Sequence, residues 1–288
     1  MLKGYIYSTL SAVLFGSAGI VVKLAYAEGL DPINLLILQY IIAVFIMFVV
    51  LVCADRAALK IRPMDLFHTA VLGIIGNTFM TVFYYLAFSY LDVPLVAILL
   101  YTYPIMVFIY MFVFERKAAG KGKLIALLTA FTGCFFSLGL TSGVGRLSLL
   151  GIGFGLLSAV FFSFMNIYSE KKLRNVNPLC INFYSTAFSL ISLIIYEPPH
   201  FIIGAGINTR LIGLTTVLAV FCEIVPLTLL YAAIKYIGSL KVSIIGNLEI
   251  PTAMILSFVL LGESLTSIQV IGAAMVIYSV YRIESKTI

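Results

Sequence analysis

Two carboxylates lie in the middle of long apolar runs, where an ionised side chain is costly. Glu223 lies in the run 208–234, and Glu249 lies in the run 240–261, two residues before Pro251. Because charge is expensive in hydrocarbon, a buried acid there holds a proton, hydrogen-bonds or pairs with a cation. These two acids could bind a cation, the amino group of a zwitterion or a coupling proton. The alternative is that they are hydrogen-bonded groups that only fix helix packing.

Aromatic side chains are spaced so that they could face these acids. Asn77, which lies 146 residues before Glu223, starts a helical stripe that contains Tyr84 and Tyr85, and Glu223 shares a helical face with Tyr231. Aromatic rings attract organic ammonium groups by about 0.5 to 2 kcal/mol per contact. The stripe therefore suits an organic amine, although packing or a place in the interfacial aromatic belt explains the tyrosines equally well.

Other polar and ring side chains in the apolar runs are further candidates. The groups that could line a binding cavity are Gln39, Tyr101, Asn166, Asn182 and Asn247. Hydrogen bonding between helices accounts for any one of them as well as ligand binding does. Pro104, Pro226 and Pro251 each remove a backbone donor within an apolar run. They are predicted hinges that could open a central cavity, and static packing kinks are the alternative.

The amino-acid composition indicates that these residues lie on membrane-spanning helices. The 288 residues are 62% hydrophobic and only 10% charged, whereas soluble domains carry about 25% charged residues. Spans of about 20 residues predict an all-α integral membrane protein with ten transmembrane helices. The predicted spans are 4–26, 33–53, 67–90, 93–114, 122–141, 149–170, 178–197, 208–234, 240–261 and 265–283. Asp31-Pro32, Asn177-Pro178 and the pair Thr266 and Gln269 are expected helix starts.

The basic residues indicate how these spans are oriented. Of the eighteen lysines and arginines, only Lys23, Arg146 and Arg210 fall on one side of the predicted membrane, so fifteen fall on the other. Cytoplasmic loops carry such an excess, which places both termini in the cytoplasm. The net charge of +6 is thus explained by topology rather than by nucleic acid. We expect a multi-pass protein of a bacterial or archaeal cytoplasmic (inner) membrane.

The chain also repeats itself at an offset of 146 to 148 residues. The matching positions are Leu10-Ser11-Ala12-Val13 with Leu157-Ser158-Ala159-Val160, Asp31-Pro32 with Asn177-Pro178, Tyr85 with Tyr231, and Pro104 with Pro251. This predicts two domains, 1–144 and 145–288. Each holds five spans, an odd number, so the second half enters the membrane from the opposite side. Inverted halves of this kind are the structural basis of alternating access.

With these features the sequence resembles the drug/metabolite transporter superfamily, in its ten-helix EamA-domain type. The resemblance rests on the two halves, on Tyr85-Leu86-Ala87-Phe88-Ser89-Tyr90 leading to Pro104, and on Leu260-Leu261-Gly262-Glu263-Ser264-Leu265. It implies transport of amino acids, amines, nucleotide-linked sugars or other small metabolites, often outward. One position departs from the family, because Gln39 stands where many relatives carry an arginine.

The sequence thus predicts a secondary transporter and not an enzyme. It has no phosphate-binding loop and no nucleophile paired with a base, and no cofactor or metal is expected. We expect export of small polar or amphipathic metabolites, amino acids or organic amines, in exchange for protons. The alternative is uptake or facilitated movement of an organic cation, driven by its own gradient and the membrane potential.

The expected partners are a small-molecule substrate, the lipid bilayer and a coupled proton, without nucleic acid. Glycines at 151, 153, 155 and 272 suit close helix packing, either within a monomer or between the subunits of a homodimer. Four single cysteines, Cys53, Cys134, Cys180 and Cys222, are expected to be small buried side chains.

Overall fold

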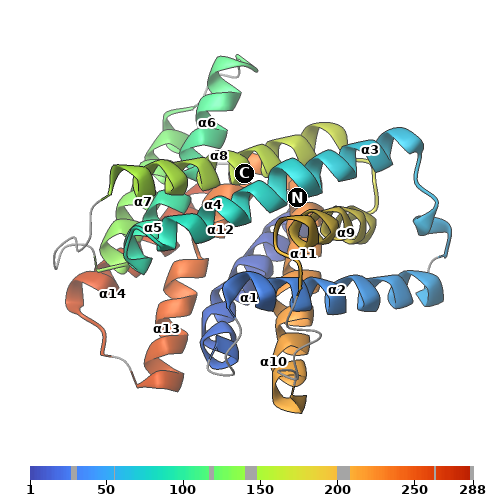
Figure 1. Cartoon of the computed structure of the whole chain (residues 1–288). Coiled ribbons are helices and arrows are strands. Elements are labelled where there is room, and N and C mark those ends of the chain that lie inside the picture. The colour runs from blue at the N-terminus through green and yellow to red at the C-terminus, as the bar shows by residue number, and fades with distance from the viewer. Residues whose placement is uncertain are drawn as a thin grey trace.

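The computed structural model is helical throughout the residues that it describes (Figure 1). These are residues 1–26, 31–54, 56–116, 120–139, 148–199, 208–262 and 264–285. Within them no strand occurs. In chain order the elements are α1 (Leu2–Tyr26), α2 (Pro32–Ala54), the 3-10 turn η1 (Arg56–Leu59), α3 (Pro63–Val71), the π-helix η2 (Leu72–Thr78), α4 (Phe79–Phe88), α5 (Val93–Leu100), α6 (Tyr103–Val113), α7 (Lys121–Ser137), α8 (Leu149–Lys172), α9 (Pro178–Tyr196), α10 (Thr209–Ala219), the π-helix η5 (Val220–Ile224), α11 (Val225–Ile237), α12 (Ser239–Gly246), α13 (Glu249–Leu261) and α14 (Ser267–Ser285).

Eight helical stretches in the described residues are long and apolar enough to cross a membrane. They are α1, α2, α8, α9 and the runs formed by α3 to α4, α5 to α6, α10 to α11, and α12 to α13. Ser267–Ile283 in α14 is a shorter apolar helix. The all-helical membrane architecture is confirmed, while the count of ten spans and the cytoplasmic position of both termini stay predictions.

The expected helix starts are confirmed by their hydrogen bonds. Asp31 Oδ1 accepts a backbone N–H of the first turn of α2 at 3.1 Å, and Asn177 Oδ1 does the same for α9 at 2.9 Å. Before α14, Gln269 Oε1 accepts the Thr266 N–H at 3.0 Å. Such side chains satisfy backbone donors that have no partner within the helix.

Four spans are interrupted at positions that match between the two halves. The π-helices η2 and η5 start 148 residues apart, at Leu72 and Val220. α5 and α6 are separated by a break at 101–102, and α12 and α13 are separated by a break at 247–248. These spacings agree with the sequence repeat, and both kinds of interruption free backbone groups from regular helical bonding.

The three expected hinge prolines lie directly after these interruptions. Pro104 and Pro226 stand in the first turns of α6 and α11, and Pro251 is the third residue of α13. Pro104 follows a break in its span, where a missing backbone N–H leaves no helical hydrogen bond unmade. Pro226, in contrast, follows η5 within the continuous helical run Thr209–Ile237 and removes a backbone donor from it. The role of the prolines as hinges stays a prediction.

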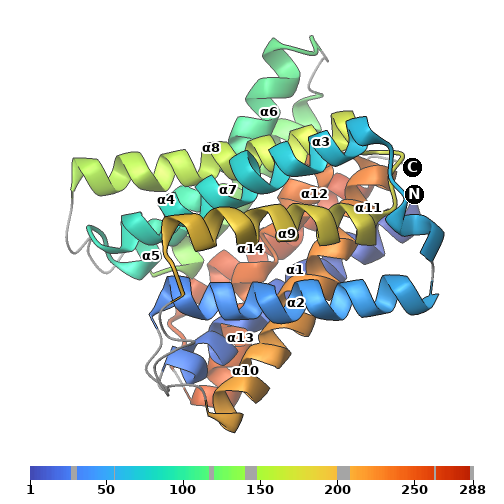
Figure 2. The same ribbon diagram turned by 45° about the vertical axis from the view of Figure 1, so that its right-hand side comes forward.

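Helices from the two sequence halves pack against each other throughout the described structure. α1 packs against α11 and α13, α4 against α8, α9 against α2 and η2, and α7 against α14. The chain ends lie beside each other in both views, and Figure 2 shows them at the same end as the connection from α2 to α3. The halves therefore interleave, and a space between α1, α4 and α13 is a space between halves.

Glycines permit the closest of these helix contacts. A Cβ atom at Gly272 would lie 2.5 Å from the Ser137 backbone nitrogen, and one at Gly133 would lie 2.8 Å from the Gly272 carbonyl oxygen. Gly151 and Gly155 of α8 approach leucine side chains of the chain around α5 in the same way. Close packing at Gly151, Gly155 and Gly272, which the sequence leaves open between monomer and dimer, occurs within the chain, whereas a Cβ atom at Gly153 would meet nothing within 4 Å.

The prediction that all four cysteines are buried is wrong for one of them. Cys134, Cys180 and Cys222 are buried, but Cys53 near the end of α2 is exposed. In a membrane protein the lipid-facing and the core-facing residues of a helix are both apolar, so a continuous apolar run does not indicate which face a residue occupies.

Ser11 and Ser158 occupy matching positions of the repeat but make different hydrogen bonds. We therefore expect alanine substitutions at the two positions to lower the free energy of unfolding by different amounts. Ser11 Oγ donates to the Pro226 carbonyl of α11 at 2.7 Å, while Ser158 Oγ donates to the Gly155 carbonyl of its own helix at 2.7 Å. We expect Ser11→Ala to lower the free energy of unfolding by about 1 kcal/mol, because it removes a buried bond between halves. Ser158→Ala should cost less. Thermal unfolding in detergent measures both, and equal melting temperatures would contradict the expectation.

Candidate functional site

A cavity of about 960 Å³ opens between helices of the two halves. It extends from helix ends at Asp31, Asp92 and Tyr196 to the mid-span carboxylate of Glu249. Its lining residues come mostly from α1, α4 and the start of α2: Phe15, Ala18, Gly19, Val22, Asp31, Pro32, Ile33, Val82, Tyr84, Tyr85, Leu86, Phe88, Ser89, Leu91, Asp92, Val93, Tyr196 and Glu249. Three of these described lining residues are acidic and none is basic, so the cavity suits a positively charged ligand.

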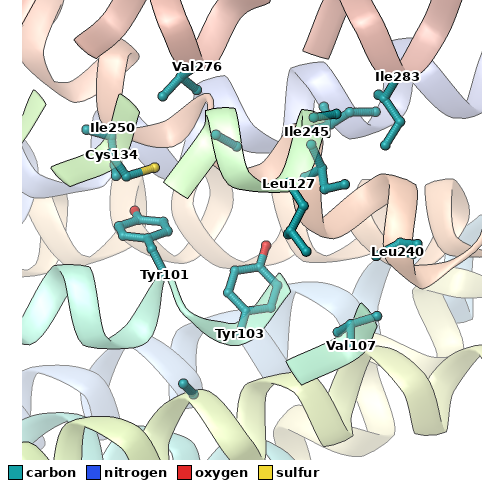
Figure 3. Close-up of a cluster of buried hydrophobic side chains, with 14 of the residues drawn as sticks. Tyr101, Tyr103, Val107, Leu127, Cys134, Leu240, Ile245, Ile250, Val276 and Ile283 are labelled. Carbon is teal, nitrogen blue, oxygen red and sulfur yellow. The ribbon is translucent and has the colours of Figure 1, made fainter. Parts of the chain in front are cut away.

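Glu249, the acidic lining residue that is farthest from the ends of its span, lies next to a break in that span. Glu249 is the first residue of α13, directly after the break at 247–248, where backbone N–H groups favour a negative charge. Tyr101, from the break between α5 and α6, is buried, and its side chain interacts with the Glu249 carboxyl group. Figure 3 shows Tyr101 near Cys134 and Ile250, in a cluster of buried hydrophobic side chains. Tyr101 thus interacts with the acid but does not line the cavity.

Gly16 of α1 allows this acid to approach the first half. A Cβ atom at Gly16 would lie 2.6 Å from the Glu249 carbonyl oxygen and 2.8 Å from Thr252 Cβ. This role of Gly16 was not predicted from the sequence. One signal could have indicated it, because the matching position of the second half is Ser163, which is also small.

The aromatic stripe of α4 forms one wall of the cavity, as predicted. Tyr84, Tyr85 and Phe88 all line it, and the Tyr84 and Phe88 rings meet edge to face at 4.8 Å between centroids. Phe15 and Tyr196 add aromatic groups from α1 and α9. The ligand space therefore combines ring faces with carboxylates, which is the combination that recognises organic ammonium groups.

Asn77, the inner end of the same stripe, lies outside the cavity lining. It is buried, and its Nδ2 donates to the Tyr40 hydroxyl of α2 at 3.0 Å. Tyr40 is itself buried, and it was not singled out by the sequence analysis. This hydrogen bond joins α2 to η2, and neither residue lines the cavity.

Glu223, unlike Glu249, lies outside the cavity. It lies on η5, is 7% exposed and does not line the cavity. Its Oε1 lies 3.2 Å from Thr186 Oγ1 of α9, and Asn182 and Tyr231 are buried beside it. The two acids that the sequence groups together are therefore divided between an open cavity and an enclosed polar cluster.

The other predicted lining amides are buried away from the cavity. Gln39 Nε2 lies 3.5 Å from the Leu218 carbonyl, and Asn166 Nδ2 donates to the Phe162 carbonyl of its own helix. Asn247 is buried at the break before α13. Of these three residues, only Gln39 makes a polar contact with another helix in the described structure, and the Oδ1 atoms of Asn166 and Asn247 are buried there without a hydrogen-bond partner.

Charged groups near the helix ends make further contacts. Glu115, at the end of the α5 to α6 run, pairs with Lys171 of α8, which agrees with a structural role. Glu263 and His200 lie outside the described residues.

Comparisons with known proteins agree with this architecture. The model of the EamA-like transporter family matches residues 2–139 and 149–284. A protein of Bacillus subtilis (strain 168), named uncharacterized transporter YcbK, is 24% identical over 98% of this chain and 92% of its own length. Uncharacterized transporters of Clostridium kluyveri and Archaeoglobus fulgidus are each 25% identical, over 96% and 99% of this chain and 91% and 100% of their own.

The fold is also found among solved structures. A protein of known crystal structure superposes with a TM-score of 0.78 over 98% of this chain and 96% of that chain, at 14% identity. At that identity the likeness concerns the fold alone. The family match and the named relatives indicate a transporter and not an enzyme. This multi-pass membrane protein belongs to the EamA-like transporter family.

Proposed function

We propose that the protein exports small organic amines or amino acids across a bacterial or archaeal cytoplasmic membrane, in exchange for protons. The observation that carries this proposal is the cavity, in which aromatic side chains lead from Asp31 and Asp92 to Glu249. Its volume of about 960 Å³ lies within the range of small-molecule sites. The named relatives are transporters from bacteria and archaea, which supports the setting.

Glu249 would bind the amino group of the cargo in this proposal. The ring faces of Tyr84 and Tyr85 would surround the substituents next to the ammonium, and the rim acids would raise the local concentration of cations. A zwitterion would place its amine at Glu249 and its carboxylate toward backbone or hydroxyl donors.

Alternating access between the halves would carry the cargo across. The matching interruptions in the two halves and the family model that matches each half support two inverted units, 1–144 and 145–288. Protons would supply the driving force, and the two mid-span acids Glu223 and Glu249 are the groups that would exchange them.

A second candidate is uptake of an organic cation along its own gradient. It is favoured by the cavity opening at Asp31, Asp92 and Tyr196, which is the extracytoplasmic end in the predicted topology. An exporter also passes through such a state when it releases cargo, so the opening alone does not choose the direction.

Proteoliposomes that contain a pH-sensitive dye test the proposal. If the protein exchanges amines for protons, an amine gradient should drive protons in the opposite direction. The rate of this proton movement should saturate as the amine concentration rises. Amine uptake that follows the membrane potential without proton movement would favour the second candidate. Absence of any saturable flux of amines or amino acids would contradict both.

The ring of Tyr85 should matter more than its hydroxyl group. We expect Tyr85→Phe to keep the affinity for a quaternary ammonium probe such as tetraethylammonium, because the ring face remains. Tyr85→Leu should lower it about 2- to 30-fold, which corresponds to a cation–π contribution of about 0.5 to 2 kcal/mol. Calorimetric titration of the purified protein measures both. Equal affinities of the two variants would show that the ring face does not bind the cation.

A further inference from the structure

Glu223 ends a short chain of polar groups that connects α9 to the span of η5 and α11. Thr186 Oγ1 lies 3.0 Å from Asn182 Oδ1 and 3.2 Å from Glu223 Oε1. Asn182 and Thr186 are fully buried. α9 lies beside α2 and α11 (Figure 2), and none of the three polar residues lines the cavity.

The orientation of the Asn182 amide follows from its other contacts. Its Nδ2 lies 3.1 Å from the Ile224 carbonyl oxygen and 3.1 Å from Thr228 Oγ1. A backbone carbonyl only accepts hydrogen bonds, so the nitrogen must face Ile224 and the Oδ1 atom must face Thr186. Asn182 Oδ1 therefore needs a donor from the Thr186 side.

Counting donors assigns the proton of the Thr186 hydroxyl group. That hydroxyl has a single hydrogen, and it lies between two oxygen atoms, Asn182 Oδ1 and Glu223 Oε1. If Glu223 were ionised, Thr186 could serve only one of them, and a buried acceptor without a donor is unfavourable. If Glu223 carries a proton, Glu223 donates to Thr186 and Thr186 donates to Asn182, so these three groups are satisfied, while the hydroxyl of the neighbouring Tyr231 makes no hydrogen bond in the described structure.

The charges around Glu223 agree with the neutral form. The titratable side chains that face it in the described structure are Tyr40 of α2 and Tyr231 of α11, with Cys222 next to it in η5. No described lysine, arginine or histidine interacts with its carboxyl group. Arg210 of α10 lies thirteen residues earlier, about 20 Å along the helical axis.

Two neighbouring helices complete these surroundings. α1 packs against η5, and the side chain of its Lys23 is outside the described residues. Glu249 of α13, the other mid-span acid, lies on the cavity and not in this cluster. No described cation is therefore placed to stabilise an ionised Glu223.

We infer that Glu223 is a dedicated proton-binding site, separate from the Glu249 cavity, and that it holds its proton as first donor of the chain Glu223, Thr186, Asn182. Release of that proton requires η5 and α9 to move apart or the Asn182 amide to find another donor. The role of this movement in transport rests on the proposed exchange with protons. The presence of the proton on Glu223 does not rest on that proposal, because it follows from the hydrogen bonds of the described structure.

Infrared spectroscopy of the full-length protein in lipid nanodiscs tests this without ligand or gradient. The carbonyl stretch of a protonated carboxylic acid is resolved from that of a carboxylate. At pH 7 we expect such a band in the wild type, and we expect Glu223→Gln to abolish it. Raising the pH titrates the band and gives its midpoint. Failure of amine transport in liposomes would leave this result untouched.

Two further variants test the donor count. Asn182→Leu keeps the side-chain shape but frees the Thr186 hydrogen for an ionised Glu223, so the midpoint should fall by about one to two pH units. Thr228→Val removes a different partner of the same amide and should leave the midpoint unchanged. The inference is overturned if the wild type has no band sensitive to Glu223→Gln at pH 7, or if Asn182→Leu does not lower the midpoint. Should Asn182→Leu fail to fold, the Glu223→Gln spectrum still decides.

Discussion

Replacing Glu249 with glutamine is expected to weaken the binding of a primary amine by about 10- to 150-fold. Glutamine keeps the size of the side chain, but it removes the negative charge from a residue that lines the cavity. Hydrogen bonds to charged groups contribute about 1.5 to 3 kcal/mol, which gives this range of affinity. Calorimetric titration with phenethylamine, compared with its neutral alcohol analogue, measures the loss.

Two controls make the Glu249 experiment specific. Glu170 of α8 lies away from the cavity, where its Oε2 accepts the Ser239 N–H at 2.8 Å. Glu170→Gln retains an acceptor for that bond and should leave amine affinity unchanged. The neutral alcohol should bind wild type and Glu249→Gln alike. If the variant lost affinity for alcohol and amine equally, Glu249 would shape the cavity rather than bind the ammonium.

Replacing Gly16 with alanine is expected to shift Glu249, which lines the cavity, because the added methyl group meets the backbone of α13. The alanine Cβ would meet the Glu249 carbonyl oxygen at 2.6 Å, a backbone atom that cannot rotate away. α1 and α13 must then separate, and overpacking of this kind costs about 1 to 3 kcal/mol. We expect Gly16→Ala to lower the melting temperature and to reduce amine affinity at least tenfold, because the carboxylate moves with its helix.

Gly19, one turn further along α1, supplies the matched control. It lines the cavity, and a Cβ atom there would meet nothing within 4 Å. Gly19→Ala carries the same change in helix propensity and should leave the melting temperature unchanged or higher. Equal destabilisation by the two alanines would attribute the effect to α1 itself rather than to its contact with Glu249.

The sequence predicts the helices well because their signals are local. Apolar runs, and polar caps such as Asp31 and Asn177, are properties of neighbouring residues, and the structure confirms the caps. The stripe of Tyr84 and Tyr85 could also be predicted, since helical spacing alone puts these residues on one face. Both line the cavity.

The division of the site could not be predicted from the same information. Glu223 and Glu249 look equivalent as mid-span acids, but the packing of α1 and α2 against η5 and the contact of Thr186 of α9 enclose Glu223, whereas Glu249 lines the cavity. Tyr101 and Gly16 act through contacts with residues more than a hundred positions away. In a membrane chain both faces of a helix are apolar, so hydrophobicity does not specify such contacts.

The exposure of Cys53 has a practical consequence for spectroscopy. The other three cysteines are buried, and a thiol reagent reacts with an accessible thiolate. A membrane-permeant maleimide fluorophore or spin label added to the unaltered protein would therefore attach first at Cys53, near the end of α2. The native chain thus offers a reporter for that helix during a transport cycle, without the cysteine-free background that such labelling usually demands.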